Sequence, residues 1–135
     1  LPELVVIGDS PVAKALCSLG VQFQFSIRTI DPDASLMPSP RQRYVVIATQ
    51  GQGDMVALNA ALSCDPSSIS FVGSSRKFAA LSQKLLDAGA DPAAVQSVKA
   101  PAGLNINAVT PDEIALSILA ELIKQRRAAR AEEKK

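Results

Sequence analysis

Histidine is missing from this sequence, and cysteine occurs only twice among its 135 residues. The lack of histidine excludes histidine-based acid–base catalysis and histidine-ligated metal sites, and two cysteines are too few for a thiolate zinc site. We therefore expect no metal site. Cys17 and Cys64 both fall within predicted helices among apolar neighbours. We expect them to be reduced core thiols of a cytoplasmic protein, with a sulfur-handling role as the alternative.

Long apolar runs and a secretory signal are also missing, so we expect a soluble protein without membrane partners. The formal net charge is only +1, which argues against nucleic acid as a partner. Positive charge gathers instead near the end of the chain. From Lys124 onward, six basic and two acidic residues give +4, which leaves −3 for the remainder. We interpret residues 125–135 as a charged, frayed C-terminal tail.

The stretch that organises the chain is Leu4–Ile7, four consecutive aliphatic residues that suit a strand buried on both faces. Similar strands are predicted at Ser26–Ile30, Tyr44–Ala48 and Ser68–Val72, the second of these after a proline-bearing loop. The alternation of strands with helical segments predicts an α/β fold: an open parallel sheet of order about 3-2-1-4 with helices on both faces. We therefore predict one Rossmann-like domain over residues 1–124.

Several polar residues are placed to cap the N-termini of helices. The predicted caps are Asp54, Ser74 or Ser75, and Asp91. Thr110–Glu113 reads as a capping box with proline at the first helical position, worth roughly 1 kcal/mol of helix-end stability. The helix that follows is apolar on most sides from Ile114 to Ile123, which predicts self-association as a homodimer.

The turn after the first strand is the first candidate for a binding site, because ligands of open parallel sheets collect beyond the carboxyl ends of strands. Gly8 keeps the first position of the G-x-G-x-x-G fingerprint, while Ser10 and Ala13 replace the other two glycines. Asp31 follows Gly8 by 23 residues, near the spacing of the acidic residue that binds a ribose hydroxyl. The alternative is a tight turn that only joins strand to helix. The candidate cofactor-binding residues here are Gly8, Asp9, Ser10 and Asp31.

Two further turns reach the same edge of the predicted sheet, at Thr49–Asp54 and Gly73–Lys77. Arg76 and Lys77 fall in a first helical turn, where the helix dipole disfavours cations unless a bound anion offsets them. A phosphate there would meet backbone amides, serine hydroxyls and a guanidinium. The alternative is two solvated basic residues that tolerate the dipole. The candidate binding residues from these turns are Thr49, Gln50, Asp54, Gly73, Ser74, Ser75, Arg76 and Lys77.

Three ordered motifs occupy the second half of the chain: Gly73–Lys77 (GSSRK), Ala100–Ile106 (APAGLNI) and Thr110–Glu121 (TPDEIALSILAE). Together they closely resemble the C-terminal Rossmann domain of the xanthine dehydrogenase accessory family (XdhC/CoxI), whose pattern reads GSxRK, APxGLDI and TPEEIAxSILAE. The resemblance covers essentially the whole chain and adds Pro101 and Gly103 to the candidate cofactor site. It implies binding of the molybdenum cofactor, help with its sulfuration or protection, and its delivery to molybdenum hydroxylases such as xanthine or carbon monoxide dehydrogenase.

The leading hypothesis is therefore a non-catalytic accessory protein for the maturation of molybdenum hydroxylases. Its partners would be the client enzyme and cofactor-biosynthesis proteins, and its ligand would be molybdopterin or its nucleotide form, with Arg76 and Lys77 on the phosphate. The alternatives are an NAD(P)- or nucleotide-binding oxidoreductase and a regulatory Rossmann module with a vestigial site. Against the oxidoreductase, Ser10 adds a side chain where a pyrophosphate needs close approach, Pro11 removes an amide, and 135 residues leave no room for a substrate domain. No catalytic residue is assigned.

Overall fold

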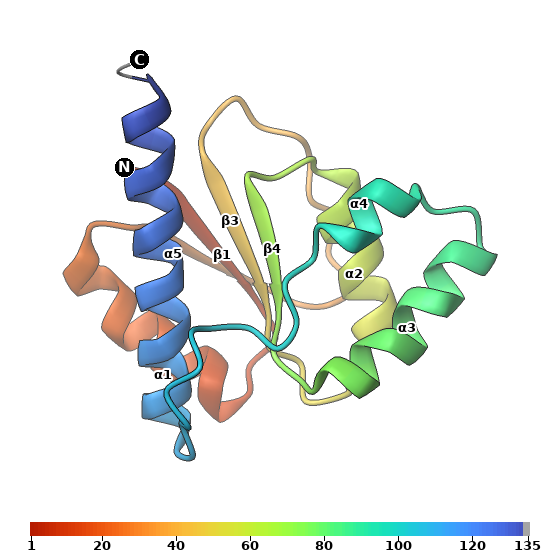
Figure 1. Ribbon diagram of the computed structural model, residues 1–135, viewed down its shortest axis with the longest axis horizontal. Helices are drawn as coiled ribbons and strands as arrows, with labels where there is room; N and C mark the ends of the chain where they lie inside the picture. Colours follow the sequence, from red (N-terminus) through yellow and green to blue (C-terminus); the bar gives the residue numbers. More distant parts are fainter. Residues whose placement is uncertain (134–135) are drawn as a thin grey trace.

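A computed structural model describes residues 1–133, and within them four strands form one parallel sheet with helices on both sides (Figure 1). The elements in chain order are β1 (Glu3–Ile7), α1 (Pro11–Gly20), the 3-10 helix η1 (Val21–Phe23), β2 (Ser26–Ile30), β3 (Arg43–Ile47), α2 (Asp54–Ser63), β4 (Ser68–Phe71), α3 (Ser75–Asp87), α4 (Pro92–Gln96) and α5 (Pro111–Glu133). Each neighbouring pair of strands runs parallel. The predicted Rossmann-like α/β fold is confirmed.

The order of the strands differs from the prediction of 3-2-1-4, because the sheet is ordered β2-β1-β3-β4. The two central strands, β1 and β3, are buried at every residue, and Val5 pairs with Val45 between them. Strand β2 exposes Arg28 and Thr29, which suits an edge position better than the central one predicted for it. From β1 the chain continues to β2, which lies on one side of β1 in the sheet. It then crosses to β3, which lies on the other side of β1. The point where the strand order reverses therefore lies between β1 and β3.

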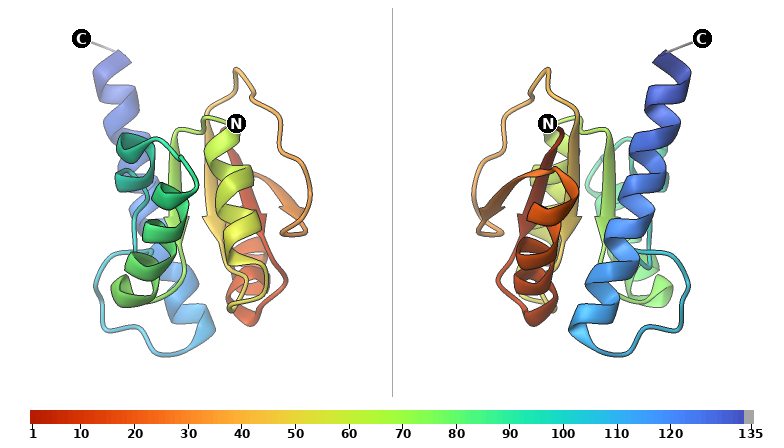
Figure 2. Two further views of the ribbon diagram at one scale, coloured as in Figure 1. Left: turned by 90° about the vertical axis from the view of Figure 1, so that its right-hand side faces the viewer. Right: turned by 90° about the vertical axis from the view of Figure 1, so that its left-hand side faces the viewer.

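Side chains alternate along the strands between two helical layers. One layer holds α1 and α5, which pack side by side over Leu4, Val6 and Tyr44 (Figures 1 and 2). The other layer holds α2, α3 and α4, which cover Val5 and Val45. Both layers contribute fully buried aliphatic side chains, so the sheet is the middle of a three-layer sandwich.

The last helix, α5, uses most of its apolar side chains within the chain. Ile118, Leu119 and Leu122 are buried, whereas Leu116 remains 49% exposed. Self-association, which was predicted from this helix, stays a prediction. Although α5 is long, neither it nor any other helix of residues 1–133 has the length and apolar character needed to cross a membrane.

Helix α5 also crosses the predicted domain boundary at residue 124 and continues to Glu133. Just beyond that boundary Arg126 is buried, because its Nη1 donates to the Phe23 carbonyl at 2.8 Å and its guanidinium lies 4.5 Å from the centre of the Phe25 ring. The division of the chain at this point, and the fraying of the tail, stay predictions. Part of that tail, residues 134–135, lies outside the described residues.

Most of the predicted helix caps are confirmed. Ser74 accepts from the Lys77 amide at 3.0 Å, and Asp91 accepts from the Ala93 amide at 3.3 Å. The prediction for Asp54 is wrong, because Gly53 occupies the cap position of α2 with φ +82° and Asp54 is the first helical residue. The reason is a tertiary contact of the Asp54 carboxylate, described below.

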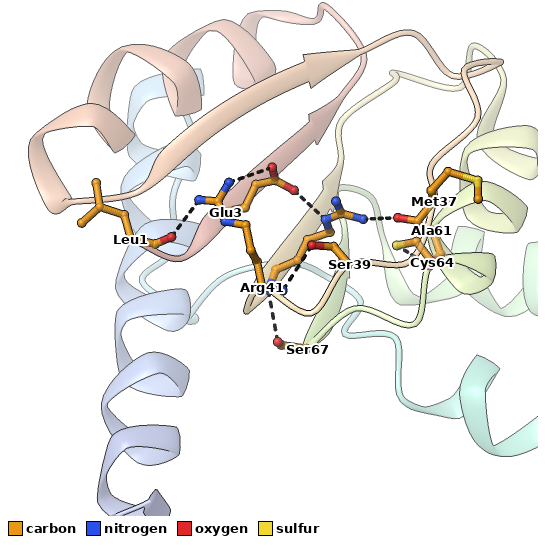
Figure 3. Close-up of polar contacts among 9 residues, drawn as sticks. Leu1, Glu3, Met37, Ser39, Arg41, Ala61, Cys64 and Ser67 are labelled. Atoms are coloured by element: carbon orange, nitrogen blue, oxygen red, sulfur yellow. Dashed lines mark hydrogen bonds and ion pairs between the residues drawn. The ribbon is translucent and has the colours of Figure 1, made fainter.

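The amino-terminal edge of the sheet is closed by an ion pair between the first residues of β1 and β3. Arg43 Nε lies 2.6 Å from Glu3 Oε1, and the side chains are only 7% and 9% exposed. Arg43 Nη1 also donates to the Met37 carbonyl at 2.7 Å, and Arg41 lies 3.6 Å from the second Glu3 oxygen (Figure 3). These contacts attach the irregular loop between β2 and β3 to the sheet.

Candidate ligand-binding site

The carboxyl edge of the sheet begins with the turn after β1, where Gly8 lies next to the end of β3. Gly8 has φ +115°, and a Cβ on it would collide with the Ala48 carbonyl and lie 2.9 Å from its carbon. Strands β1 and β3 are therefore closer together here than any other residue would permit. Gly8 is required for this close approach, whether or not a ligand binds there.

Ser10 turns its hydroxyl toward β3 and away from solvent. It is 6% exposed, donates to the Ala48 carbonyl at 2.7 Å and accepts from the Ala13 amide at 3.2 Å. Pro11 carries no N–H, so the first turn of α1 has one backbone donor fewer than usual. A second donor, the Ala13 amide, is already used by the Ser10 hydroxyl. In the described part of the chain, Val12 alone keeps an unpartnered amide in that turn. The start of α1 is therefore a poor site for a pyrophosphate, in agreement with the sequence argument.

A pocket of about 650 Å³ lies beside this turn, between α1 and the end of β2. We call it the β1–β2 pocket; its lining residues are Gly8, Asp9, Ala13, Lys14, Cys17, Thr29, Ile30, Asp31 and Ala34. Three of the predicted site residues, Gly8, Asp9 and Asp31, are brought together here. Burial raises the pKa of the Cys17 thiol, which disfavours its thiolate form.

The turn after β3 is joined to the start of α3 by side chains. The Thr49 hydroxyl donates to Asp54 Oδ1, and Lys77 Nζ lies 3.3 Å from Asp54 Oδ2. Because Asp54 is 7% exposed, this carboxylate is committed to Thr49 and Lys77 rather than to a helix cap or a ligand. The predicted role of Lys77 on a phosphate therefore competes with an internal ion pair. Gln50 lies in the same turn, exposed and with φ +53°.

The start of α3 presents a different set of groups. Ser75 and Arg76 are exposed, and across the residues described no hydrogen bond or ion pair involves the Arg76 guanidinium. Unlike the first turn of α1, this turn contains no proline, and only its Lys77 amide is used by the cap. The predicted anion-binding turn is thus better supplied with free donors than the glycine fingerprint turn.

A second pocket, of about 680 Å³, lies between the end of β4 and α5. We call it the β4–α5 pocket. It is lined by Val72, Gly73, Ser74, Lys99, Pro101, Ala102, Gly103, Leu104, Asn105, Ile106, Asn107, Ala108, Ile114 and Ser117. The predicted residues Gly73, Ser74, Pro101 and Gly103 meet here, whereas Ser10, Gln50, Ser75 and Arg76 line neither pocket.

Two charged residues of this region, Lys99 and Glu121, were not predicted from the sequence as part of a site. Lys99 lines the pocket, and its Nζ lies 3.2 Å from an oxygen of Glu121, which is buried in α5. The available signal was the charge of Glu121 itself, since it interrupts an otherwise apolar face of the last helix. Within residues 1–133 no group of three acidic, cysteine or histidine side chains is placed to hold a metal ion.

Comparison with known proteins shows to which family this chain belongs. Residues 4–122 match the family described as the XdhC Rossmann domain. The uncharacterized protein YqeB of Escherichia coli (strain K12) is 27% identical over 147 aligned positions, which cover 91% of this chain and 27% of that protein. The crystal structure of a xanthine dehydrogenase from Bacillus halodurans has the same fold, with a TM-score of 0.80 and 24% identity, over 98% of this chain and 46% of that one. This chain thus spans about a quarter of the length of the first protein and less than half of the second. Since the match runs through all four strands and about half of α5, the chain belongs to the XdhC family as its Rossmann domain.

Proposed function

We propose that this domain serves an accessory protein for the maturation of molybdenum hydroxylases of the xanthine dehydrogenase type. In this proposal it binds the molybdenum cofactor in the β4–α5 pocket and presents it to the client enzyme. The family match and the fold shared with a protein described as a xanthine dehydrogenase support this direction. The domain itself carries out no covalent step.

The observation that carries the proposal is that three motifs, separate in the sequence, line one pocket. The first motif contributes Gly73 and Ser74, the second contributes the stretch 101–106, and the third contributes Ile114 and Ser117. The β1–β2 pocket contains none of these residues. The motifs shared with the family therefore converge on the β4–α5 pocket and not on the pocket beside the glycine turn.

The residues of this pocket fit a phosphorylated pterin. Val72, Ile106 and Ile114 provide apolar surface for a flat ring, and the side-chain amides of Asn105 and Asn107 can pair with its edge. Lys99 provides a cation for an anionic group. When bound, the cofactor would supply the redox-active metal to the client enzyme, while this chain only holds and orients it.

A second candidate function is favoured by one specific observation. The β1–β2 pocket places Asp31 near Gly8, as a nucleotide-binding Rossmann domain would for a ribose. This arrangement supports binding of NAD(P) or another nucleotide. The committed hydroxyl of Ser10 and the missing amide of Pro11 speak against a pyrophosphate at the adjacent helix.

The two candidates are separated by filling each pocket in turn. Ala34 and Ala108 are half-buried loop residues that line the β1–β2 and the β4–α5 pocket, respectively, so Ala34→Phe and Ala108→Phe form a matched pair. Isothermal titration with molybdopterin should show that Ala108→Phe weakens binding at least about tenfold while Ala34→Phe leaves it unchanged. Tight binding of NAD alone, lost in Ala34→Phe, would instead establish the nucleotide-binding alternative.

A further inference from the structure

We propose that Lys99 binds the anionic group of the ligand in the β4–α5 pocket, and that the buried carboxylate of Glu121 positions it. This inference rests on the proposed function, which it deepens by naming the cation of the site. Lys99 takes the role that the sequence suggested for Lys77 and Arg76. Lys77 is paired with Asp54, and Arg76 lies outside both pockets.

Glu121 is well placed to fix the wall of the pocket. Its side chain is 9% exposed, and its two oxygens have different partners on the segment that follows α4. One oxygen accepts from the Gly103 amide at 3.2 Å, and the other lies 3.2 Å from Lys99 Nζ. A single buried carboxylate therefore contacts both the backbone of the wall and its cation, whose Nζ also donates to the Pro101 carbonyl at 3.5 Å.

The backbone of Lys99 is held as firmly as its side chain. Its amide donates to the Ile69 carbonyl at 2.9 Å, and its carbonyl accepts from the Phe71 amide at 2.9 Å, so it extends the sheet beyond β4. The side chain then reaches Glu121 while remaining 48% exposed, and Lys99 is one of the residues that line the pocket. A lysine whose backbone and ammonium group are both held in place, but whose side chain is still partly open to solvent, can bind an anion with little loss of side-chain entropy.

The rest of the lining shows which kind of ligand suits Lys99. Among the lining residues in the described chain, Lys99 alone carries a formal charge, and the others are apolar, amide or hydroxyl side chains. A site with one cation beside apolar surface suits a flat heterocycle that carries a phosphate group. A polyanion without a ring would meet too few partners, since Glu121 already neutralises part of the charge of Lys99.

The test compares binding of two probes, molybdopterin and inorganic pyrophosphate, by isothermal titration at several salt concentrations. Lys99→Met alone would leave the buried Glu121 carboxylate unpaired and could unfold the chain, so the decisive variant is the double replacement Lys99→Met with Glu121→Gln. It should bind molybdopterin at least about tenfold more weakly, and the dependence of affinity on salt should disappear. Lys99→Arg should retain most of the affinity, and Lys84→Met, an exposed lysine of α3 outside the pocket, should change nothing.

The single replacement Glu121→Gln tests whether Glu121 positions the ammonium of Lys99 or only stabilises the fold. Glutamine can still accept from the Gly103 amide but no longer orients the ammonium, so affinity should fall while the melting temperature stays unchanged. Unchanged or increased affinity in this variant would overturn the role of Glu121.

The same titrations keep this inference apart from the proposed function. If the wild type binds molybdopterin and the double variant binds it equally well, the role of Lys99 is wrong and the proposed function stands. If the wild type binds pyrophosphate through Lys99 but not molybdopterin, the proposed function is wrong and the anion site stands. Binding of neither probe would overturn both.

Discussion

The β1–β2 pocket and the β4–α5 pocket lie at the same edge of the sheet and have similar volumes, about 650 and 680 Å³, yet they are built in different ways. The first is formed by residues of α1 and of the end of β2, together with residues that directly follow β1 and β2. The second is formed largely by residues 99–108, which belong to no helix or strand. The pocket that carries the family motifs is thus the one with the irregular wall.

Hydrogen bonds to neighbouring elements explain how this irregular wall is ordered. The Ala102 amide donates to the Phe71 carbonyl at 2.9 Å, and the Leu104 amide donates to the Ser117 carbonyl at 3.1 Å. With the contacts of Lys99 and Gly103, the segment is attached to β4 on one side and to α5 on the other. The loop of the β1–β2 pocket is attached by the buried side chain of Leu36 and, at its far end, by Arg43, which donates to the Met37 carbonyl. Order in a pocket wall therefore depends on tertiary contacts and does not require secondary structure.

The largest expected effect comes from the glycine next to the first pocket. Gly8→Ala combines a positive φ of +115° with a collision against the Ala48 carbonyl, and we expect it to lower the free energy of unfolding by about 3 kcal/mol or more. Gly103→Ala, in the wall of the second pocket, collides with the Ser117 hydroxyl, which can move more easily than a backbone carbonyl. We therefore expect a smaller loss there, about 2 kcal/mol.

Gly89 supplies the matched control for both glycine variants. It has φ +96°, but a Cβ on it would meet nothing within 4 Å, so Gly89→Ala should cost only the backbone strain of about 1 kcal/mol. Urea unfolding followed by circular dichroism measures all three variants, since the chain has no tryptophan. Equal losses in the three would mean that the close approach at Gly8 contributes nothing.

A loss close to that of Gly8→Ala is expected from the buried ion pair at the opposite edge of the sheet. Arg43→Met leaves the Glu3 carboxylate buried with only Arg41 at 3.6 Å, and we expect a loss near the low end of the range for broken buried pairs, about 3 kcal/mol. Because the donor to the Met37 carbonyl is also lost, amide hydrogen exchange should rise in residues 33–38 and not in residues 99–105.

Adding Glu3→Gln to Arg43→Met should restore part of this stability, since no charge then remains buried. Faster exchange in both pocket walls after Arg43→Met would contradict the separation of the two regions.

Much of the fold followed from short apolar runs, because a buried parallel strand needs little more than consecutive aliphatic residues. The order of the strands was less accessible, although Arg28 and Thr29 in β2 already indicated an edge. The position of Asp54 could not be predicted either. Its carboxylate is a good helix cap by local rules, but Thr49 and Lys77 compete for it through the tertiary structure.

The candidate site shows the same division between local and distant contacts. The motifs identified Gly73, Ser74, Pro101 and Gly103, which meet in one pocket. They did not identify the ion pair of Lys99 with Glu121, because the two residues are 22 positions apart and the charge of Glu121 on an apolar helix face does not indicate which residue pairs with it. Contacts between distant segments decide which charges face a ligand, and a single sequence does not reveal them.

The smallest expected effect concerns the far end of the β4–α5 pocket wall, where the wall meets α5. Glu113 accepts from the Val109 amide at 2.8 Å and from the Thr110 amide at 3.1 Å, and these bonds lower its pKa below the ordinary value of 4.5. Since the pKa is lowered in the folded state, the cap contributes its stability above about pH 4.5 and loses it as the pH falls through the lower, folded value. Amide chemical shifts of Val109 and Thr110 should therefore titrate with a midpoint below 4.5, while the amides of the β1–β2 pocket do not follow them. Glu113→Gln should abolish this titration, and the neighbouring replacement Asp112→Asn should leave it in place. A midpoint at or above 4.5 would show that Glu113 does not hold the wall, and the wall would then depend on Glu121 and the β4 contacts alone.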